Sequence, residues 1–193
     1  MVDERRLVLR AQSGDREAFD LLLRDIAPLL LRYVTRVTGD VTLAEDVVQE
    51  TLIVIVRKIQ WLNDASLFRA WAYRIASREA FRALRKRRAV TFEPIYDDVA
   101  LADEPIDPWQ RERVLSSLES LSPASRAVIT LHYMEELPLS EIAAILDLTI
   151  GTVKSRLAYG LAQLRKLPAG LVPFLIIDFL INASIVLLVL KKG

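Results

Sequence analysis

The sequence predicts an all-α protein with two helical domains, an N-terminal helical bundle and a C-terminal helix-turn-helix domain, joined by a flexible linker and followed by an apolar C-terminal helix. Apolar residues recur at three- and four-residue steps over most of the chain, and no strand-like alternation appears. A stretch with three prolines and six acidic residues separates the two helical parts. We expect domains at residues 1–88 and 109–167, a linker at 89–108 and a tail at 168–193.

Three helices are expected in the first domain. The first starts at Asp15, and its apolar stripe consists of Phe19, Leu22, Leu23, Ile26, Leu30, Tyr33, Val34 and Val37. After a break at Gly39-Asp40, Thr42 precedes a second helix, which is expected from Leu43 to about Ile59. Its β-branched run 51–56 also fits a strand, but the flanking period favours a helix. Residues 61–66 predict a loop, and residues 67–88 a third helix. The charged N-terminus predicts no signal peptide.

The second domain is expected to contain helices at 109–120, 123–135, 140–146 and 150–166. Ser140 and Thr149 are expected to cap the last two of these helices. A short helix, a tight turn and a longer helix are the spacing of a helix-turn-helix.

The last of these helices has two distinct faces. Its apolar stripe consists of Val153, Leu157, Leu161 and Leu164, and its opposite face of Ser155, Ala158, Tyr159 and Ala162. Lys154 and Arg156 flank the second face and can reach phosphates on the walls of a major groove. An ordinary helical hairpin would show the same apolar stripe, so this pattern alone leaves both interpretations open.

Composition excludes several classes of chemistry. The chain has no cysteine, which excludes disulfides, thiolate metal sites and cysteine nucleophiles. Its single histidine, His132, excludes a histidine cluster, and no glycine-rich phosphate-binding loop is present. We therefore expect no catalytic residues, no metal and no cofactor.

The near-neutral net charge of +1 conceals two opposite charge blocks. Residues 69–88 hold eight Lys or Arg against Glu79 alone, whereas residues 89–108 hold six acids and no Lys or Arg. Arg74, Arg78, Arg82 and Arg85 recur at helical spacing and share one face, with aromatic residues nearby: Trp61, Phe68, Trp71, Tyr73 and Phe81. Cations beside aromatic rings are typical of single-strand binding. The alternative is a solvated helix end whose aromatics, above all Phe68, Trp71 and Phe81, belong to the core.

The apolar segment 171–190 is long enough for a bilayer span of about 20 residues. Its apolar residues contribute about −4 to −9 kcal/mol to insertion, whereas the central Asp178 opposes insertion by about 3 kcal/mol, and Pro173 and Asn182 oppose it further. Membrane association through this segment is thus one alternative. The others are a helix packed on protein and a non-native tail from a shifted reading frame.

Three motifs in order resemble those of one bacterial family. They are LAEDVVQE (43–50), FRAWAYRIA (68–76) and LSEIAAILDLTIGTVKSRL (139–157). The chain resembles RNA polymerase sigma factors of the extracytoplasmic-function (ECF) group of the sigma-70 family, over about residues 15–88 and 109–167. The resemblance implies a cytoplasmic, non-catalytic protein that confers promoter recognition and transcription initiation. It also implies three partners: the RNA polymerase core, through its beta-prime clamp and beta flap, promoter DNA, and an anti-sigma factor.

The resemblance assigns roles to individual residues. Polymerase binding would fall to Asp46, Gln49 and Glu50. The opened strand of the minus-ten element would meet the loop 61–66 and the helix after it, through Asn63, Trp71, Arg74, Arg78, Arg82 and Arg85. The duplex of the minus-thirty-five element would meet Thr152, Lys154, Ser155, Arg156 and Tyr159.

The chain departs from the family pattern at several positions. Arg78 stands where Asn is usual and Arg82 where Asp is common, which makes the strand-binding face more basic. In the recognition helix Tyr159 replaces a usual Arg and Ala158 replaces a usual larger residue. We therefore expect this helix to position the protein on the duplex more than it determines which base sequence is bound. His132 stands where Arg is frequent and is interpreted as structural.

Two other classes of function remain as alternatives. A polymerase-independent regulator would use only the helix-turn-helix. A membrane-tethered signalling protein would use segment 171–190 as a sensor or anchor.

Overall fold

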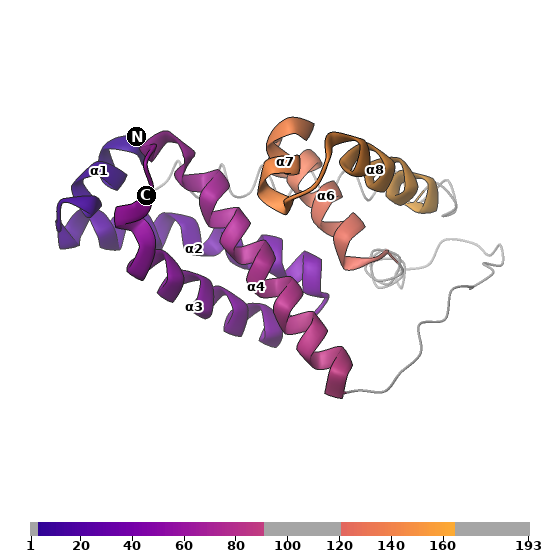
Figure 1. Cartoon of the computed structure of the whole chain (residues 1–193). Helices are drawn as coiled ribbons and strands as arrows, with labels where there is room; N and C mark the ends of the chain where they lie inside the picture. The colour runs from indigo at the N-terminus through magenta and orange to yellow at the C-terminus, as the bar shows by residue number, and fades with distance from the viewer. Residues whose placement is uncertain (1–3, 91–120, 165–193) are drawn as a thin grey trace, which may run out of the picture.

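The computed structural model describes residues 4–90 and 121–164, and within these ranges every regular element is helical (Figure 1). The elements in chain order are α1 (Glu4–Gln12), α2 (Arg16–Thr38), α3 (Val41–Lys58), the 3₁₀ turns η1 (Ile59–Trp61) and η2 (Ala65–Leu67), α4 (Phe68–Val90), α6 (Pro123–Tyr133), α7 (Leu139–Leu146) and α8 (Ile150–Leu164). The predicted all-α class is confirmed.

Helices α2, α3 and α4 form the N-terminal bundle, and local capping signals set where α2 and α3 begin and end. The Asp15 carboxylate accepts from the Ala18 N–H at the start of α2. Gly39 ends the helix in the left-handed region (φ 72°), a conformation that glycine adopts without steric cost. Asp40 then caps α3 by accepting from the Leu43 N–H at 3.0 Å. The break predicted at Gly39-Asp40 is confirmed, and α3 starts at Val41.

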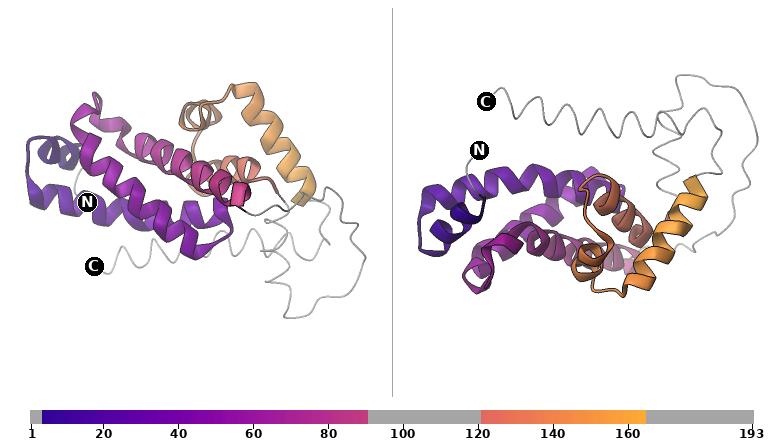
Figure 2. Two further views of the ribbon diagram at one scale, coloured as in Figure 1. Left: turned by 60° about the horizontal axis from the view of Figure 1, so that its bottom comes forward. Right: turned by 90° about the horizontal axis from the view of Figure 1, so that it is seen from above.

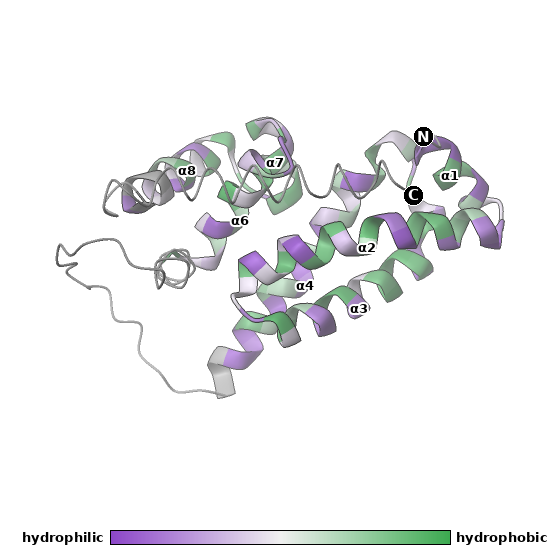
Figure 3. Cartoon of the chain, turned by 180° about the vertical axis from the view of Figure 1, so that it is seen from behind, coloured by the Kyte–Doolittle hydropathy of each residue, from purple (hydrophilic) through white to green (hydrophobic). Residues whose placement is uncertain are grey.

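The bundle core is built from one face of each helix, as the alternation of hydrophobic and hydrophilic positions around α2 and α3 shows (Figure 3). Tyr33, Phe68 and Tyr73 are the largest side chains that are almost fully buried. The rings of Tyr33 and Tyr73 meet edge to face, with centroids 5.2 Å apart. Ile55, from the β-branched run of α3, is also fully buried, and the whole run is helical.

The second module is arranged around α6, a helix buried on nearly all sides. It starts at residue 123, as predicted, with Pro123 in its first turn and the Ser122 hydroxyl accepting from the Ser125 N–H. Every residue from 125 to 131 is buried, because α2, α7 and α8 all pack against this helix. At Gly160, α8 comes so close to Ile129 of α6 that a Cβ atom would collide with that side chain.

The two modules share one hydrophobic core instead of standing apart on a tether. In the described ranges α6 packs against α2, and α7 packs against α4 (Figures 1 and 2). Val128 and Leu131 of α6 and Ile142 of α7 belong to the same buried cluster as the N-terminal bundle. The sequence predicted two helical modules but not this contact between them.

Several predicted boundaries were wrong. Helix α1 was not predicted at all, and the loop at 61–66 is flanked by two 3₁₀ turns that overlap its ends. Helix α4 continues to Val90, two residues into the expected linker. Ser140 is not the cap of α7, because that helix starts one residue earlier, at Leu139, and no side chain caps it.

Other predictions lie outside the described residues. These are the helix at 109–120, the linker from residue 91 onward and the apolar segment 171–190. Among the described helices, none is both long and apolar enough to span a bilayer.

The adjacent residues Leu67 and Phe68 provide a test of the bundle core. Phe68 is 0% exposed and Leu67 is 54% exposed. We expect Phe68→Ala to lower the free energy of unfolding by about 3–5 kcal/mol, because it leaves a cavity in the core. Leu67→Ala should change it by less than about 0.5 kcal/mol. Denaturant unfolding followed by circular dichroism measures both, and equal effects would contradict the packing described.

Candidate nucleic-acid interface

Helix α8 presents the face that the sequence predicted. Val153 is fully buried and Leu157 packs partly against the core, whereas Lys154, Ser155, Ala158 and Tyr159 are exposed. Thr152 and Arg156 are half-buried at the flanks. The exposed face thus combines small side chains with a cation at its edge, which suits close approach to a duplex.

The turn before α8 is fixed by hydroxyl bonds and one left-handed residue. Thr149 caps α8 as predicted, with its hydroxyl accepting from the Thr152 N–H at 3.1 Å. Asp147 takes the left-handed conformation (φ 58°) that ends α7. These contacts set the angle at which α8 leaves α7, so they fix the direction in which its exposed face points.

The basic face of α4 is partly engaged by carboxylates. Arg78 lies 3.7 Å from the carboxylate of Asp147 in the turn between α7 and α8, and Arg82 pairs with Glu79. Arg85 is exposed. Arg74 is half-buried, and its Nε is buried without a hydrogen-bond partner in the described structure. Of the four arginines predicted to share a face, three are therefore exposed and Arg74 is set deeper.

Among the aromatics near this face, the structure separates core from surface. Phe68 and Tyr73 are buried, and Phe81 and Trp71 pack partly against the core, with Trp71 6.3 Å from the Phe68 ring. Trp61 differs, because it is 72% exposed on the turn that precedes Asn63, which is also exposed. The sequence placed Trp61 among the aromatics near the basic face and in the loop 61–66, but the residues assigned to the strand were Asn63 and Trp71.

Helix α3 turns an acidic face away from the bundle. Asp46, Gln49 and Glu50 are all exposed, and Ile53 and Val56 continue the surface one and two turns further on. Exposed apolar side chains beside carboxylates on one helix suit a basic, partly apolar partner surface.

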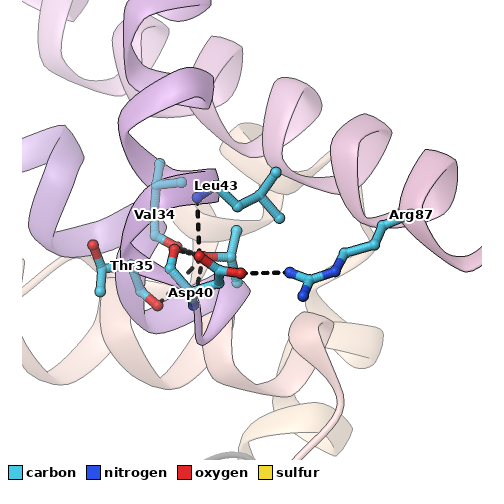
Figure 4. Close-up of polar contacts among 6 residues, drawn as sticks. Val34, Thr35, Asp40, Leu43 and Arg87 are labelled. Carbon is cyan, nitrogen blue, oxygen red and sulfur yellow. Dashed lines mark hydrogen bonds and ion pairs between the residues drawn. The ribbon is translucent and has the colours of Figure 1, made fainter.

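The start of α3 is tied to the last turns of α4 through Asp40 (Figure 4). One Asp40 oxygen caps α3, and the other accepts from Arg87 at 2.5 Å. The Leu43 N–H and the Arg87 guanidinium both stabilise the ionised carboxylate and hold the pKa of Asp40 below its usual value. This contact joins the acidic face of α3 to the basic helix beside it.

Glu135, which follows α6, influences the pKa of two groups in the first module. Burial raises the pKa of Tyr73, and the Glu135 carboxylate raises it further without reaching hydrogen-bond geometry. Burial lowers the pKa of Arg36 on α2, and the same carboxylate partly offsets that effect. A carboxylate of the second module thus lies among aromatic and cationic groups of the first.

His132 has a structural role, as predicted. Its Nδ1 is 3.1 Å from the Leu137 carbonyl oxygen, and its ring meets that of Tyr133 edge to face. Among the described residues, no cluster of acidic and histidine side chains could hold a metal ion.

The chain is thus a two-module helical protein with two separate exposed faces that carry cations, and comparisons place it in a family. Residues 22–90 match the family description "Sigma-70 region 2", and residues 117–166 match "Sigma-70, region 4". The ECF RNA polymerase sigma-E factor of Haemophilus influenzae is 34% identical over 173 residues, covering 80% of this chain and 89% of the relative. Its namesake in Escherichia coli K12 is 36% identical over 170 residues, covering 78% and 86%.

Two solved structures are also similar. CnrH, solved in complex with the cytosolic domain of CnrY, matches with a TM-score of 0.65 and 28% identity, covering 85% of this chain and 96% of that one. The sigma factor RpoE of Bartonella quintana, solved with the anti-sigma factor NepR, matches with a TM-score of 0.63 and 25% identity, covering 77% and 94%.

The chain belongs to the ECF group of sigma-70-family RNA polymerase sigma factors. It confers promoter recognition and transcription initiation on bacterial RNA polymerase.

Proposed function

We propose that three faces of this sigma factor divide the work of initiation. The acidic face of α3 binds the polymerase core, the turn around Asn63 and the basic face of α4 hold the opened minus-ten strand, and α8 reads the minus-thirty-five duplex. The supporting observation is that one acidic face and two basic faces lie on different helices and are each solvent-exposed. The proposed domains are those expected from the sequence, residues 1–88 and 109–167 with 89–108 as linker, except that α4 carries the first domain on to Val90.

Polymerase binding by α3 is supported by its chemistry. Asp46, Gln49 and Glu50 offer carboxylates and an amide, and Ile53 adds apolar area that a partner can bury. The charged groups on this face of α3 would speed association with the polymerase and select it as partner, while burial of the apolar side chains would contribute affinity.

Strand capture is supported by the combination of exposed cations and an exposed ring. Arg78, Arg82 and Arg85 can follow a phosphate backbone, and Trp61 and Asn63 can meet an unstacked base. Trp71, which is partly buried, would contribute through the part of its side chain that remains exposed.

Binding both promoter elements at once requires the modules to separate. The two elements lie about 25 base pairs apart, roughly 85 Å along the duplex. A globule of about 130 residues has a radius of gyration of roughly 14 Å, and α4 packs directly against α7. Residues 91–108 of the proposed linker can span up to about 65 Å when fully extended, which lets the two modules move well apart.

An anti-sigma factor is the partner proposed to bind the closed form, in the cytoplasm. The support is that one similar structure holds a sigma factor with its anti-sigma factor and the other holds CnrH with CnrY, and that each likeness covers most of this chain. The chain itself is proposed to catalyse no reaction. Membrane association through segment 171–190 remains a prediction of the sequence, outside the described residues.

Promoter-dependent run-off transcription with purified polymerase core tests the polymerase face. We expect the wild-type chain to support it, and Asp46→Lys with Glu50→Lys to weaken core binding on the order of tenfold or more, because both charges reverse. The matched control is Asp20→Lys with Asp25→Lys, which reverses two exposed charges on α2.

No transcription with the wild-type chain at any salt concentration would refute the proposal. If the α3 variant binds polymerase core normally, the polymerase contact lies on another surface. If the chain regulates transcription through DNA without binding polymerase, it is a stand-alone helix-turn-helix regulator.

The salt dependence of duplex binding tests α8. We expect Lys154→Ala and Arg156→Ala each to make the slope of log K against log salt shallower by about 0.9, the value for one phosphate contact. Fluorescence anisotropy of a labelled duplex measures the slope, with the exposed Arg24→Ala on α2 as control. An unchanged slope in both variants would show that neither side chain touches the backbone.

A further inference from the structure

Helix α1, which the sequence did not predict, packs against the two turns that flank the proposed strand-binding loop. In the described structure α1 contacts both η1 and η2. Its buried residues Leu7, Val8 and Ala11 face the core, where Ile59 and Ala65 of the turns are also buried. The segment 59–67 is therefore held between α1 and the ends of α3 and α4.

Gln12, the last residue of α1, bonds to the first residue of η1 and to the residue that follows η1. Its Nε2 donates to the carbonyl oxygen of Ile59 and to that of Leu62, each at 2.8 Å. The two acceptors bracket Gln60 and Trp61, and the Ile59 carbonyl also accepts from the Leu62 N–H. One half-buried amide thus uses its two donor hydrogens to close the turn that carries Trp61.

The far end of the loop is tied down as well. Asp64 accepts from the Ser66 N–H at 2.9 Å and from its hydroxyl at 2.6 Å, which closes an Asx turn. Glu4, at the start of α1, pairs with Arg69 in the first turn of α4 at 2.9 Å. Helix α1 therefore contacts segment 59–69 near both of its ends.

This bracing determines what the loop presents to solvent. Leu62 and Ala65 turn toward the core, whereas Trp61 is 72% exposed and Asn63 is exposed. Exposed rings on unbraced loops sample many orientations, and ordering them on binding costs affinity. A turn fixed by paired carbonyl contacts avoids much of that cost.

We propose that Gln12 is a positioning residue for promoter opening: it holds η1 so that Trp61 and Asn63 are preorganised for an unstacked base of the non-template strand. Gln12 itself does not touch DNA. The proposal rests on the strand-binding role proposed for this loop, and it adds α1 to the machinery of that role.

The test uses the full chain bound to polymerase core. The probe is a fluorescein-labelled single strand that carries the non-template minus-ten sequence of the promoter most enriched after polymerase pull-down and sequencing. Gln12→Met keeps the length of the side chain, removes both donors and adds no charge. Gln60→Met is the matched control, because Gln60 is exposed on the same turn.

We expect Gln12→Met to weaken single-strand binding on the order of tenfold, since two hydrogen bonds that order the turn are lost. Gln60→Met should bind like the wild-type chain. Binding to a duplex that ends upstream of the melted region should be unchanged in both. Gln12→Lys keeps hydrogen-bond donors at this position but adds a positive charge, so its control is Gln60→Lys, which adds the same charge. Gln12→Lys should bind the single strand at least as well as Gln60→Lys.

Trp61→Ala separates failure of this proposal from failure of the loop's proposed role. If Trp61→Ala leaves single-strand binding unchanged, the loop does not bind the strand and both ideas fall. If Trp61→Ala weakens binding and Gln12→Met matches Gln60→Met, only the positioning role is overturned. A Gln12→Met chain that does not fold, judged by circular dichroism, would also overturn it, because Gln12 would then support the whole bundle.

Discussion

The buried contact between α2 and α4 is the constraint on which the other surfaces depend. The hydroxyl groups of Tyr33 and Ser77 are 2.7 Å apart, and the Ser77 hydroxyl donates to the Tyr73 carbonyl. Because these groups lie in the core, misaligning the helices would leave polar atoms unpaired, which costs more than a lost surface contact. The contact therefore fixes α4, and with it the basic face, the loop before it and the surface where α7 packs.

The two modules are held together mainly by apolar burial. The Arg78–Asp147 pair is 3.7 Å long and both side chains are largely exposed, so it contributes at most about 1 kcal/mol. Val128, Leu131 and Ile142, all fully buried, account for far more. Separation of the modules would expose these side chains, so a partner that covers them, such as the polymerase core, would favour the open form. In the closed form Asp147 pairs with Arg78, one of the arginines proposed to bind DNA. Closure would therefore make Arg78 less available to the opened strand.

The periodicity of apolar residues was sufficient to predict the long helices and which face of each helix is buried. The stripe of α2, the Gly39-Asp40 break and the exposed side of α8 could be predicted because each is encoded by neighbours in sequence. Helix α1 could not be predicted in this way, since a segment of only nine residues, four of them charged, forms a stable helix only through tertiary packing. The contact between the modules could not be predicted either, because it brings together residues distant in the chain, such as Glu135 and Tyr73.

We propose that this two-module sigma factor, closed when free, must open in order to bind both promoter elements at once. Distances between spin labels test it directly, and the absence of native cysteines allows labels at Arg24→Cys and Ala144→Cys, two exposed positions on α2 and α7. We expect one short distance in the free chain, and a distance longer by several tens of ångströms on promoter DNA with polymerase core, in line with the roughly 85 Å between the elements. An unchanged short distance in a complex that starts transcription would contradict it.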